Sequence, residues 1–265
     1  MKRDPHVLRP PLKWAGGKRW LVPHLIPLWQ PHSYRRLVEP FCGGLAVALS
    51  LRPTRALLND ANPHLVNFMG KLKAGFRIDG ALDMQNDREL YYAHRARFNR
   101  LIAQGQWDSD EAAALFYYLN RTGYNGLCRF NKKGEFNVPF GRYGSIRYVR
   151  DFTVYKDVFS QWEFTCGDFA ELRVNDGDFI YADPPYDVQF TQYSRGGFDW
   201  EDQVRLAHWL VKHPGPVVAS NQATPRIVEL YQDLGFTLRF LDAPRMISCN
   251  GNREYVREVL AQKNL

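Results

Sequence analysis

The chain has 265 residues, enough for one large α/β domain or for a domain that carries an insert. Hydrophobic residues make up 45% and charged residues 24%, which is ordinary for a globular protein and excludes a disordered, low-complexity chain. The net charge of +7 and the aromatic share of 14% are unusual. A basic surface attracts polyanions and aromatic rings offer bases a face for stacking, although a basic protein without a polyanion partner has the same composition.

The cysteines do not indicate a disulfide framework or a metal site. None of the four forms a C-x-x-C pair or lies at metal-ligand spacing with a histidine, so we predict free thiols and no metal: Cys42, Cys128, Cys166 and Cys249. No run of about 18 apolar residues occurs, and Lys13 and several prolines follow the N-terminus in place of a long apolar core. We therefore expect a cytoplasmic protein without a membrane span.

The first sixty residues predict the opening of a nucleotide-binding α/β fold. Apolar residues near helical spacing predict a helix over 19–30. A short strand over 36–41 then runs into a glycine turn and a helix over 46–51. A second strand over 55–60 ends on an acidic residue, as in dinucleotide-binding folds.

The middle of the chain has a different character. Residues 63–120 are predicted to be mostly helical, whereas 121–150 are rich in glycine, asparagine, aromatic residues and arginine. The second stretch holds seven basic residues and one acidic residue, a net charge of +6. Later strands are predicted at 178–182, 216–220, 236–241 and 255–260, with a helix at 200–212. The simplest layout is one α/β domain made of 1–62 and 150–265, interrupted by an insert over 63–149.

The most specific motif is Asp183-Pro184-Pro185-Tyr186, directly after the apolar strand residues 179–182. The two prolines end the strand and fix an extended exit, so the motif is presented at the carboxyl end of a strand, where open α/β sheets bind ligands. A proline-rich loop with an incidental aspartate and tyrosine is the alternative.

This motif suits methylation of the exocyclic amino group of a base. The lone pair of an adenine amino nitrogen is delocalised into the ring, and an acceptor on each N–H bond would localise it. The Asp183 carboxylate and the Pro184 carbonyl can supply two acceptors. Tyr186 offers a face for a flipped-out base, a contact worth about 1–3 kcal/mol.

Two further segments are compatible with a nucleoside cofactor. In Phe41-Cys42-Gly43-Gly44 the glycines allow close approach of a ligand to the backbone, although a plain turn has the same sequence. Asp60 ends the next strand, where an acid can hold a ribose hydroxyl pair, and the absence of G-x-G-x-x-G argues against NAD. In the segment 13–18, Trp14 could stack on a cofactor and Lys18 could bind its carboxylate, whereas a basic N-terminal arm is the alternative.

Together these segments resemble the DNA adenine methylase (Dam) family, the D12 class or alpha group of N6-adenine DNA methyltransferases. The resemblance runs from residue 12 to about 254. It rests on Leu12 to Lys18, Val38 to Gly44, Asn120 to Arg129, Gly134 to Gly141, Asp183 to Tyr186, Ser220-Asn221 and Ser248 to Gly251. One departure is visible, because the family's cofactor loop often reads F-x-G-x-G and Leu45 stands at the second glycine position. We expect a slight shift of this loop.

The resemblance implies a Rossmann-like S-adenosylmethionine-dependent methyltransferase fold, with an inserted helical and β-hairpin DNA-recognition domain. The catalytic domain would be 1–62 and 150–265, and the target-recognition domain 63–149. The family's catalytic motif falls on Asp183, Pro184, Pro185 and Tyr186. Its cofactor contacts fall on Trp14, Lys18, Phe41, Gly43, Asp60, Asp168 and Asp183, with Asp168 near the cofactor adenine. S-adenosylhomocysteine would be the product.

The resemblance also implies a DNA-reading hairpin in the basic stretch. Arg129, placed at the base of this hairpin, would bind a guanine through two hydrogen bonds. Tyr124, Asn125 and Leu127 would lie near the target base and its partner strand. The remaining contacts, to bases or phosphates, fall on Lys13, Arg121, Asn137, Pro139 and Arg142. A solvated charged loop is the alternative interpretation.

The expected activity is therefore methylation of a flipped-out adenine in double-stranded DNA, with GATC as the site and with or without a restriction partner. Methylation of cytosine N4 is the nearer alternative, because the catalytic motif suits either amino group. A DNA-binding module that has lost catalysis is the more distant one. A monomer in solution is compatible with the sequence.

Overall fold

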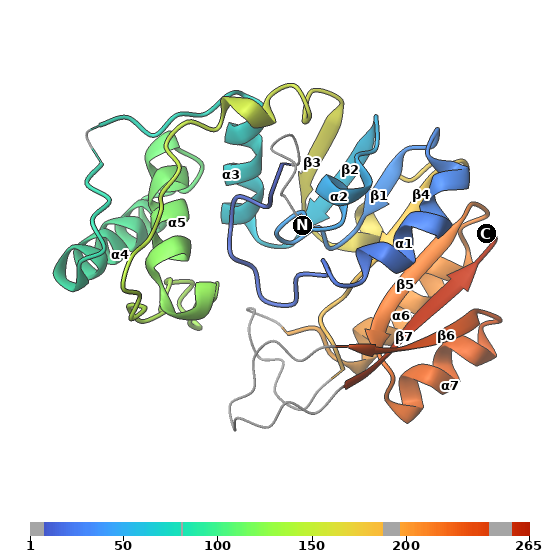
Figure 1. Cartoon of the computed structure of the whole chain (residues 1–265). Helices are drawn as coiled ribbons and strands as arrows, with labels where there is room; N and C mark the ends of the chain where they lie inside the picture. The colour runs from blue at the N-terminus through green and yellow to red at the C-terminus, as the bar shows by residue number, and fades with distance from the viewer. Residues whose placement is uncertain (1–7, 81, 188–196, 244–255) are drawn as a thin grey trace.

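Seven strands form a single sheet in the computed structural model, which describes residues 8–80, 82–187, 197–243 and 256–265. The strand order across the sheet is β3-β2-β1-β4-β5-β7-β6 (Figure 1). The strands are β1 (Leu37–Glu39), β2 (Ala56–Asp60), β3 (Trp162–Cys166), β4 (Phe179–Ala182), β5 (Val217–Gln222), β6 (Thr237–Ala243) and β7 (Val256–Lys263).

The directions of the strands define where a ligand can bind. Strands β1 to β5 run parallel, whereas β7 is antiparallel to both β5 and β6. From β1 the chain builds outward through β2 to β3, and then returns to place β4 on the other side of β1. The carboxyl ends of β1 and β4 thus flank the topological switch point, the position at which open α/β sheets bind ligands.

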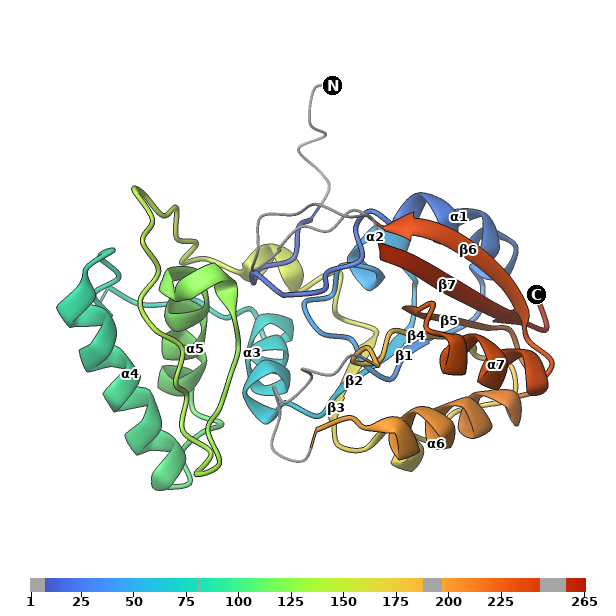
Figure 2. The same ribbon diagram turned by 90° about the horizontal axis from the view of Figure 1, so that it is seen from below.

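Helices cover both faces of the sheet. Figure 2 shows α1 (Val22–Trp29) and α2 (Ala48–Leu51) on one face and α6 (Trp200–Val211) and α7 (Pro225–Asp233) on the other. Successive strand residues point to opposite faces, so Leu37 packs in one buried cluster and Val38 in the other. The prediction of a Rossmann-like α/β fold is confirmed. None of the described helices is long and apolar enough to cross a membrane.

Three helices lie beyond the β3 edge of the sheet: α3 (Pro63–Lys73), α4 (Arg88–Ala103) and α5 (Asp110–Thr122) (Figure 1). The Asn62 side chain caps α3 by accepting from the amides of His64 and Leu65. Buried residues of α3 and α5 belong to the same apolar cluster as one face of the sheet. The interpretation of 63–149 as a separate recognition domain stays a prediction.

Some elements differ from the sequence-based expectation. The first strand ends at Glu39, because Pro40 has no N–H to donate to a ladder. Strand β3 and helix α7 were not predicted. Only Trp162 is buried in β3, so this edge strand shows no apolar run, and α7 is a short helix that begins at Pro225. Short 3-10 helices complete the described structure: η1 (Gln30–His32), η2 (Tyr124–Gly126), η3 (Thr153–Tyr155) and η4 (Phe169–Glu171).

Candidate active site

The predicted catalytic motif begins where β4 ends. Asp183 follows Ala182 directly and therefore lies at the switch point beside β1, as expected. Its Oδ1 accepts a hydrogen bond from Ser220 Oγ at 2.9 Å and lies 3.3 Å from Lys18 Nζ. The side chain is 20% exposed, so the carboxylate is mostly withdrawn from water but is still partly exposed.

Lys18 lies in the middle of an acidic cluster. Its Nζ is 3.8 Å from Glu258 Oε1 and 4.2 Å from the centroid of the Tyr186 ring. Burial raises the pKa of Asp183, and the Lys18 charge together with the Ser220 hydrogen bond opposes that rise. Burial also raises the pKa of Glu39, with a further contribution from the Asp183 charge. Lys18 thus offsets buried negative charge and favours an ionised Asp183.

Side-chain amides hold the turn that follows Asp183. Gln203 Nε2 donates to the Pro185 carbonyl at 2.8 Å, and Asn221 Nδ2 donates to Gln203 Oε1 at 2.9 Å. Pro184 is buried and Pro185 is exposed. Within the described residues no donor engages the Pro184 carbonyl.

The glycine loop after β1 packs against the N-terminal segment. A Cβ added at Gly43 would lie 2.8 Å from Trp14 Nε1, and one at Gly44 would lie 2.7 Å from Trp14 Cβ, so the indole requires both glycines. The next residue, Leu45, is fully buried and has a φ of +63°, in the left-handed region that glycine favours. The chain therefore keeps a glycine-like turn with leucine at this position.

Asp60 and Phe41 border the carboxyl ends of β1 and β2. Asp60 Oδ2 accepts from the Gly43 amide at 3.1 Å, and Oδ1 accepts from the Asn62 amide at 2.9 Å. Burial raises the pKa of Asp60 to about 6, although both amides oppose the rise. The Phe41 ring packs against Phe169 at 5.6 Å. The loop after β1 is thus tied to the end of β2.

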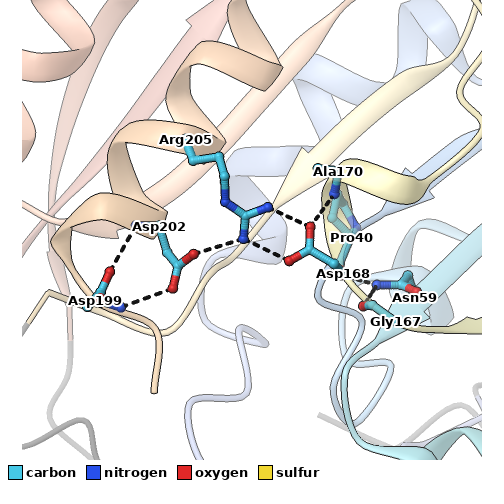
Figure 3. A network of polar contacts seen from close by, with 8 residues as sticks. All are labelled: Pro40, Asn59, Gly167, Asp168, Ala170, Asp199, Asp202 and Arg205. Carbon is cyan, nitrogen blue, oxygen red and sulfur yellow. Dashed lines mark hydrogen bonds and ion pairs between the residues drawn. The ribbon is translucent and has the colours of Figure 1, made fainter. Parts of the chain in front are cut away.

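Asp168, which follows β3, is paired with an arginine that the sequence analysis did not single out. Arg205 on α6 donates through both Nη atoms to the two Asp168 oxygens at 2.7 Å and also to Asp202 (Figure 3). The hydrogen bonds from Arg205 lower the pKa of Asp168. Asn59 Nδ2 joins the same region by donating to the Pro40 and Gly167 carbonyls, each at 3.0 Å (Figure 3).

The structure therefore brings the predicted residues to the carboxyl edge of the sheet, where acceptors, aromatic faces and a glycine loop meet. Comparison with known proteins shows the family to which the chain belongs. The model of the D12 class N6 adenine-specific DNA methyltransferases matches residues 14–246. The chain belongs to this family.

Relatives of this D12 methyltransferase match over most of its length. It is 38% identical to a DNA adenine methylase of Vibrio cholerae, with 94% of each chain covered. It is 35% identical to the type II methyltransferase M1.LlaDCHI of Lactococcus lactis, over 90% of this chain and 89% of that one. A DNA N-6-adenine-methyltransferase of Escherichia phage P1 is 36% identical over 91% of this chain, which spans about a third, 33%, of that longer protein.

The basic stretch of the methyltransferase forms a hairpin-like excursion rather than a regular ladder. Isolated antiparallel bridges pair Gly123 with Phe140 and Phe130 with Phe136. The Tyr124 amide donates to the Pro139 carbonyl at 2.9 Å near the base, and the chain reverses at residues 131–135. Arg129 therefore lies near the tip and not at the base, which corrects the sequence-based placement. The reason is that Arg129 is opposite Asn137, two residues from the turn.

The side chain of Arg129 forms hydrogen bonds between the two segments that flank the turn at residues 131–135. Its Nε donates to Asn137 Oδ1 at 2.8 Å, and its Nη2 lies 3.3 Å from the Asn137 carbonyl. Tyr124, Asn125, Pro139 and Arg142 are exposed, and Arg121 and Leu127 are half-buried. The structure thus groups the predicted DNA contacts on this excursion, except for Arg121, which lies in the last turn of α5, and Lys13.

Lys13 joins this excursion to the N-terminal segment. Its backbone exchanges two hydrogen bonds with the buried Asn120 side chain, at 2.9 Å and 2.7 Å. Its Nζ donates to the Arg121 carbonyl at 3.1 Å and lies 3.6 Å from the Tyr143 ring centroid. Burial, with a contribution from Arg121, lowers the Lys13 pKa. Lys13 and Trp14 thus link the base of the excursion to the glycine loop.

Sequence reasoning missed three residues that contact the predicted site residues: Gln203, Arg205 and Glu258. They lie in an ordinary helix and in the last strand, where nothing in the local pattern distinguishes them. Glu39, which belongs to the segment Val38 to Gly44, is buried near Asp183, and the two carry like charges when both are ionised. The matched segment Ser248 to Gly251 and Cys249 lie outside the described residues.

Proposed function

We propose that this adenine-specific DNA methyltransferase transfers the methyl group of S-adenosylmethionine to N6 of an adenine turned out of duplex DNA. The observation that carries the proposal is the partly exposed carboxylate of Asp183 at the switch point. It lies beside the Tyr186 ring and the Pro184 carbonyl, which accepts no hydrogen bond from the described part of the chain. These are two acceptors and a stacking face within one four-residue turn.

The residues at the carboxyl edge fit the proposed cofactor. Asp60 retains acceptor capacity for ribose hydroxyls, because each carboxylate oxygen carries lone pairs beyond the one used by a backbone amide. Trp14 and Phe41 add aromatic surface, and Gly43 lets the Trp14 indole pack directly on the loop. Asp168 is the proposed hydrogen-bond partner of the adenine of the cofactor, and Arg205 holds the two Asp168 oxygens in a defined direction. When bound, S-adenosylmethionine supplies a methyl group already activated on a sulfonium.

Asp183 and Pro184 act on the target nitrogen in the proposed mechanism. Each accepts one N–H of the amino group, which favours a pyramidal nitrogen with a localised lone pair. Lys18 occupies one face of the Tyr186 ring, so the opposite face is the one on which the base stacks. The base must leave the duplex first, because its amino group is paired inside the helix. The lone pair would then attack the methyl group of a donor held at the carboxyl edge, with S-adenosylhomocysteine as the leaving group and one amino proton lost afterwards.

Methyl transfer to random-sequence duplex DNA, followed by nucleoside analysis and single-molecule mapping, tests the proposal. We expect N6-methyladenine at GATC, with transfer abolished in Asp183→Ala while DNA binding persists. N4-methylcytosine as the product would replace the adenine assignment. Binding of DNA without cofactor uptake would indicate a module that has lost catalysis. Near-normal turnover of Asp183→Ala would refute the mechanism.

We also propose that Arg129 reads a guanine of the site. The Asn137 tether directs its guanidinium, and two hydrogen bonds to a guanine edge would discriminate by about 1–3 kcal/mol. Arg129→Ala should therefore raise methylation at sites altered at that guanine relative to the intact site. Arg142→Ala is the matched control, since the loss of a phosphate contact weakens all sites about equally. An equal loss at every site in Arg129→Ala would refute base reading.

A further inference from the structure

Strand β5 carries two adjacent buried polar residues, Ser220 and Asn221. They are 1% and 0% exposed and lie among apolar residues of the same strand. Successive side chains of a strand point to opposite faces, so these two reach different sides of the sheet. A buried polar group is costly unless it is hydrogen-bonded, and both of these side chains support the turn that follows β4.

Ser220 acts on the Asp183 carboxylate. Its Oγ is 2.9 Å from Asp183 Oδ1 and 3.0 Å from the buried Tyr181 hydroxyl. An ionised carboxylate only accepts, so the single Ser220 proton points to Asp183 and Tyr181 donates to Ser220. Lys18 approaches the same oxygen at 3.3 Å. In the described part of the chain no donor engages Oδ2, which leaves this oxygen for the substrate.

Asn221 acts on the other end of the turn. Its Oδ1 accepts from the Gln222 amide at 2.8 Å, which fixes the orientation of the side-chain amide. Its Nδ2 then donates to Gln203 Oε1, and Gln203 Nε2 donates to the Pro185 carbonyl. Since the proline rings already fix φ at 184 and 185, anchoring the Pro185 carbonyl restricts the remaining freedom of the Pro184 carbonyl.

We propose that Ser220 and Asn221 are positioning residues for methyl transfer: Ser220 orients the Asp183 carboxylate, and Asn221, through Gln203, orients the Pro184 carbonyl. The inference rests on the proposed function, in which those two groups accept the N–H bonds of the target amine. Neither residue has to contact the substrate. Two adjacent residues of β5 thereby orient both groups that accept the N–H bonds of the target amine.

The two roles predict different pH behaviour. The groups that face Asp183 are Lys18 before α1, Glu39 on β1, Tyr181 on β4, Tyr186 in the turn, Ser220 on β5 and Glu258 on β7. Of these groups, Lys18 and Ser220 are the two that stabilise the ionised carboxylate. Loss of Ser220 therefore shifts Asp183 protonation to higher pH. Activity that needs the ionised carboxylate is lost as pH falls through the pKa of Asp183. The low-pH side of the kcat–pH profile, its acid limb, therefore shifts to higher pH in a variant without Ser220.

Steady-state and single-turnover kinetics of Ser220→Ala across a range of pH test the first role. We expect kcat to fall about 10- to 100-fold, as for a lost hydrogen bond to a charged group, with KM for DNA and cofactor within about threefold. The acid limb should shift to higher pH. Ser220→Thr keeps the hydroxyl and should restore both kcat and the acid limb. Ser160→Ala removes an exposed hydroxyl and is the control that should leave both unchanged.

Asn221→Leu tests the second role with little change of volume and no change of charge. It removes the donor to Gln203 Oε1, so Gln203 Nε2 is no longer held against the Pro185 carbonyl. We expect about a tenfold loss of kcat, with no shift in the low-pH side of the kcat–pH profile. An unchanged kcat in Ser220→Ala or Asn221→Leu would overturn the corresponding role, as would equal shifts of the low-pH side in both variants.

A measurement that does not depend on turnover separates this inference from the proposed function. Carbon-13 NMR titration of the Asp183 carboxyl, assigned with Asp183→Asn, should give a higher pKa in Ser220→Ala than in the wild type. Identical pKa values would overturn the role of Ser220 even if the enzyme methylates adenine. Absence of methylation by the wild type would instead refute the proposed function.

Discussion

Replacing Asp183 by asparagine should stop methyl transfer more thoroughly than the similarity of the two side chains suggests. Ser220 and Lys18 both donate to Oδ1. In Asp183→Asn these two donors would take the single oxygen of the new side-chain amide, because an ammonium cannot accept a hydrogen bond. The NH₂ group would then face the target amine, so a donor would stand where the reaction needs an acceptor.

The magnitude follows from the loss of one preorganised polar group at the reacting centre. Removing such a group typically costs about 10²- to 10³-fold in kcat. We expect at least this loss in Asp183→Asn, and no more activity than in Asp183→Ala, which has no donor to misplace. Lys18 keeps Glu258 as a charged neighbour, so thermal stability and DNA affinity should change little.

The assay is single-turnover transfer from tritiated cofactor at saturating DNA, with fluorescence anisotropy for DNA binding. A rate for Asp183→Asn above about one hundredth of the wild-type rate would refute the argument, because the expected loss is at least about 10²-fold. So would a rate well above that of Asp183→Ala, because the side-chain amide would then have turned its oxygen toward the substrate.

Three further outcomes are expected. Since burial raises the pKa of Asp60 to about 6, cofactor affinity should fall as pH drops below that value, and calorimetry of Asp60→Asn should show weak binding without this pH dependence. DNA affinity should fall as salt concentration rises, with a log–log slope of about −4 to −5 if about five phosphates are neutralised. An affinity independent of salt would show that the basic stretch 121–150 does not contact the DNA phosphates. Leu45→Gly should unfold at no lower urea concentration than Leu45→Ala, because glycine relieves about 1–2 kcal/mol of strain at a φ of +63°; a clearly less stable glycine variant would contradict this.

Local sequence determined the framework of the site. The apolar run at 179–182 followed by two prolines places Asp183 at the end of a strand, because prolines cannot continue a ladder. Asp60 likewise follows a short apolar run, Ala56 to Leu58, and ends β2. The glycine loop could also be predicted from the sequence, since only glycine lets another group, here the Trp14 side chain, pack so close to the backbone. Such signals are carried by a few adjacent residues.

Only the tertiary structure decided which distant side chains support those residues. Arg205 reaches Asp168 from 37 residues away in sequence, Ser220 reaches Asp183 from the same separation, and Glu258 approaches Lys18 from the last strand. Arg129 lies near the tip of the hairpin and not at the predicted base, because its position depends on the pairing register of the two strands and not on its distance from a glycine. Buried charges and amides find partners through the order of the strands, and that order is a property of the packed sheet that no local pattern records.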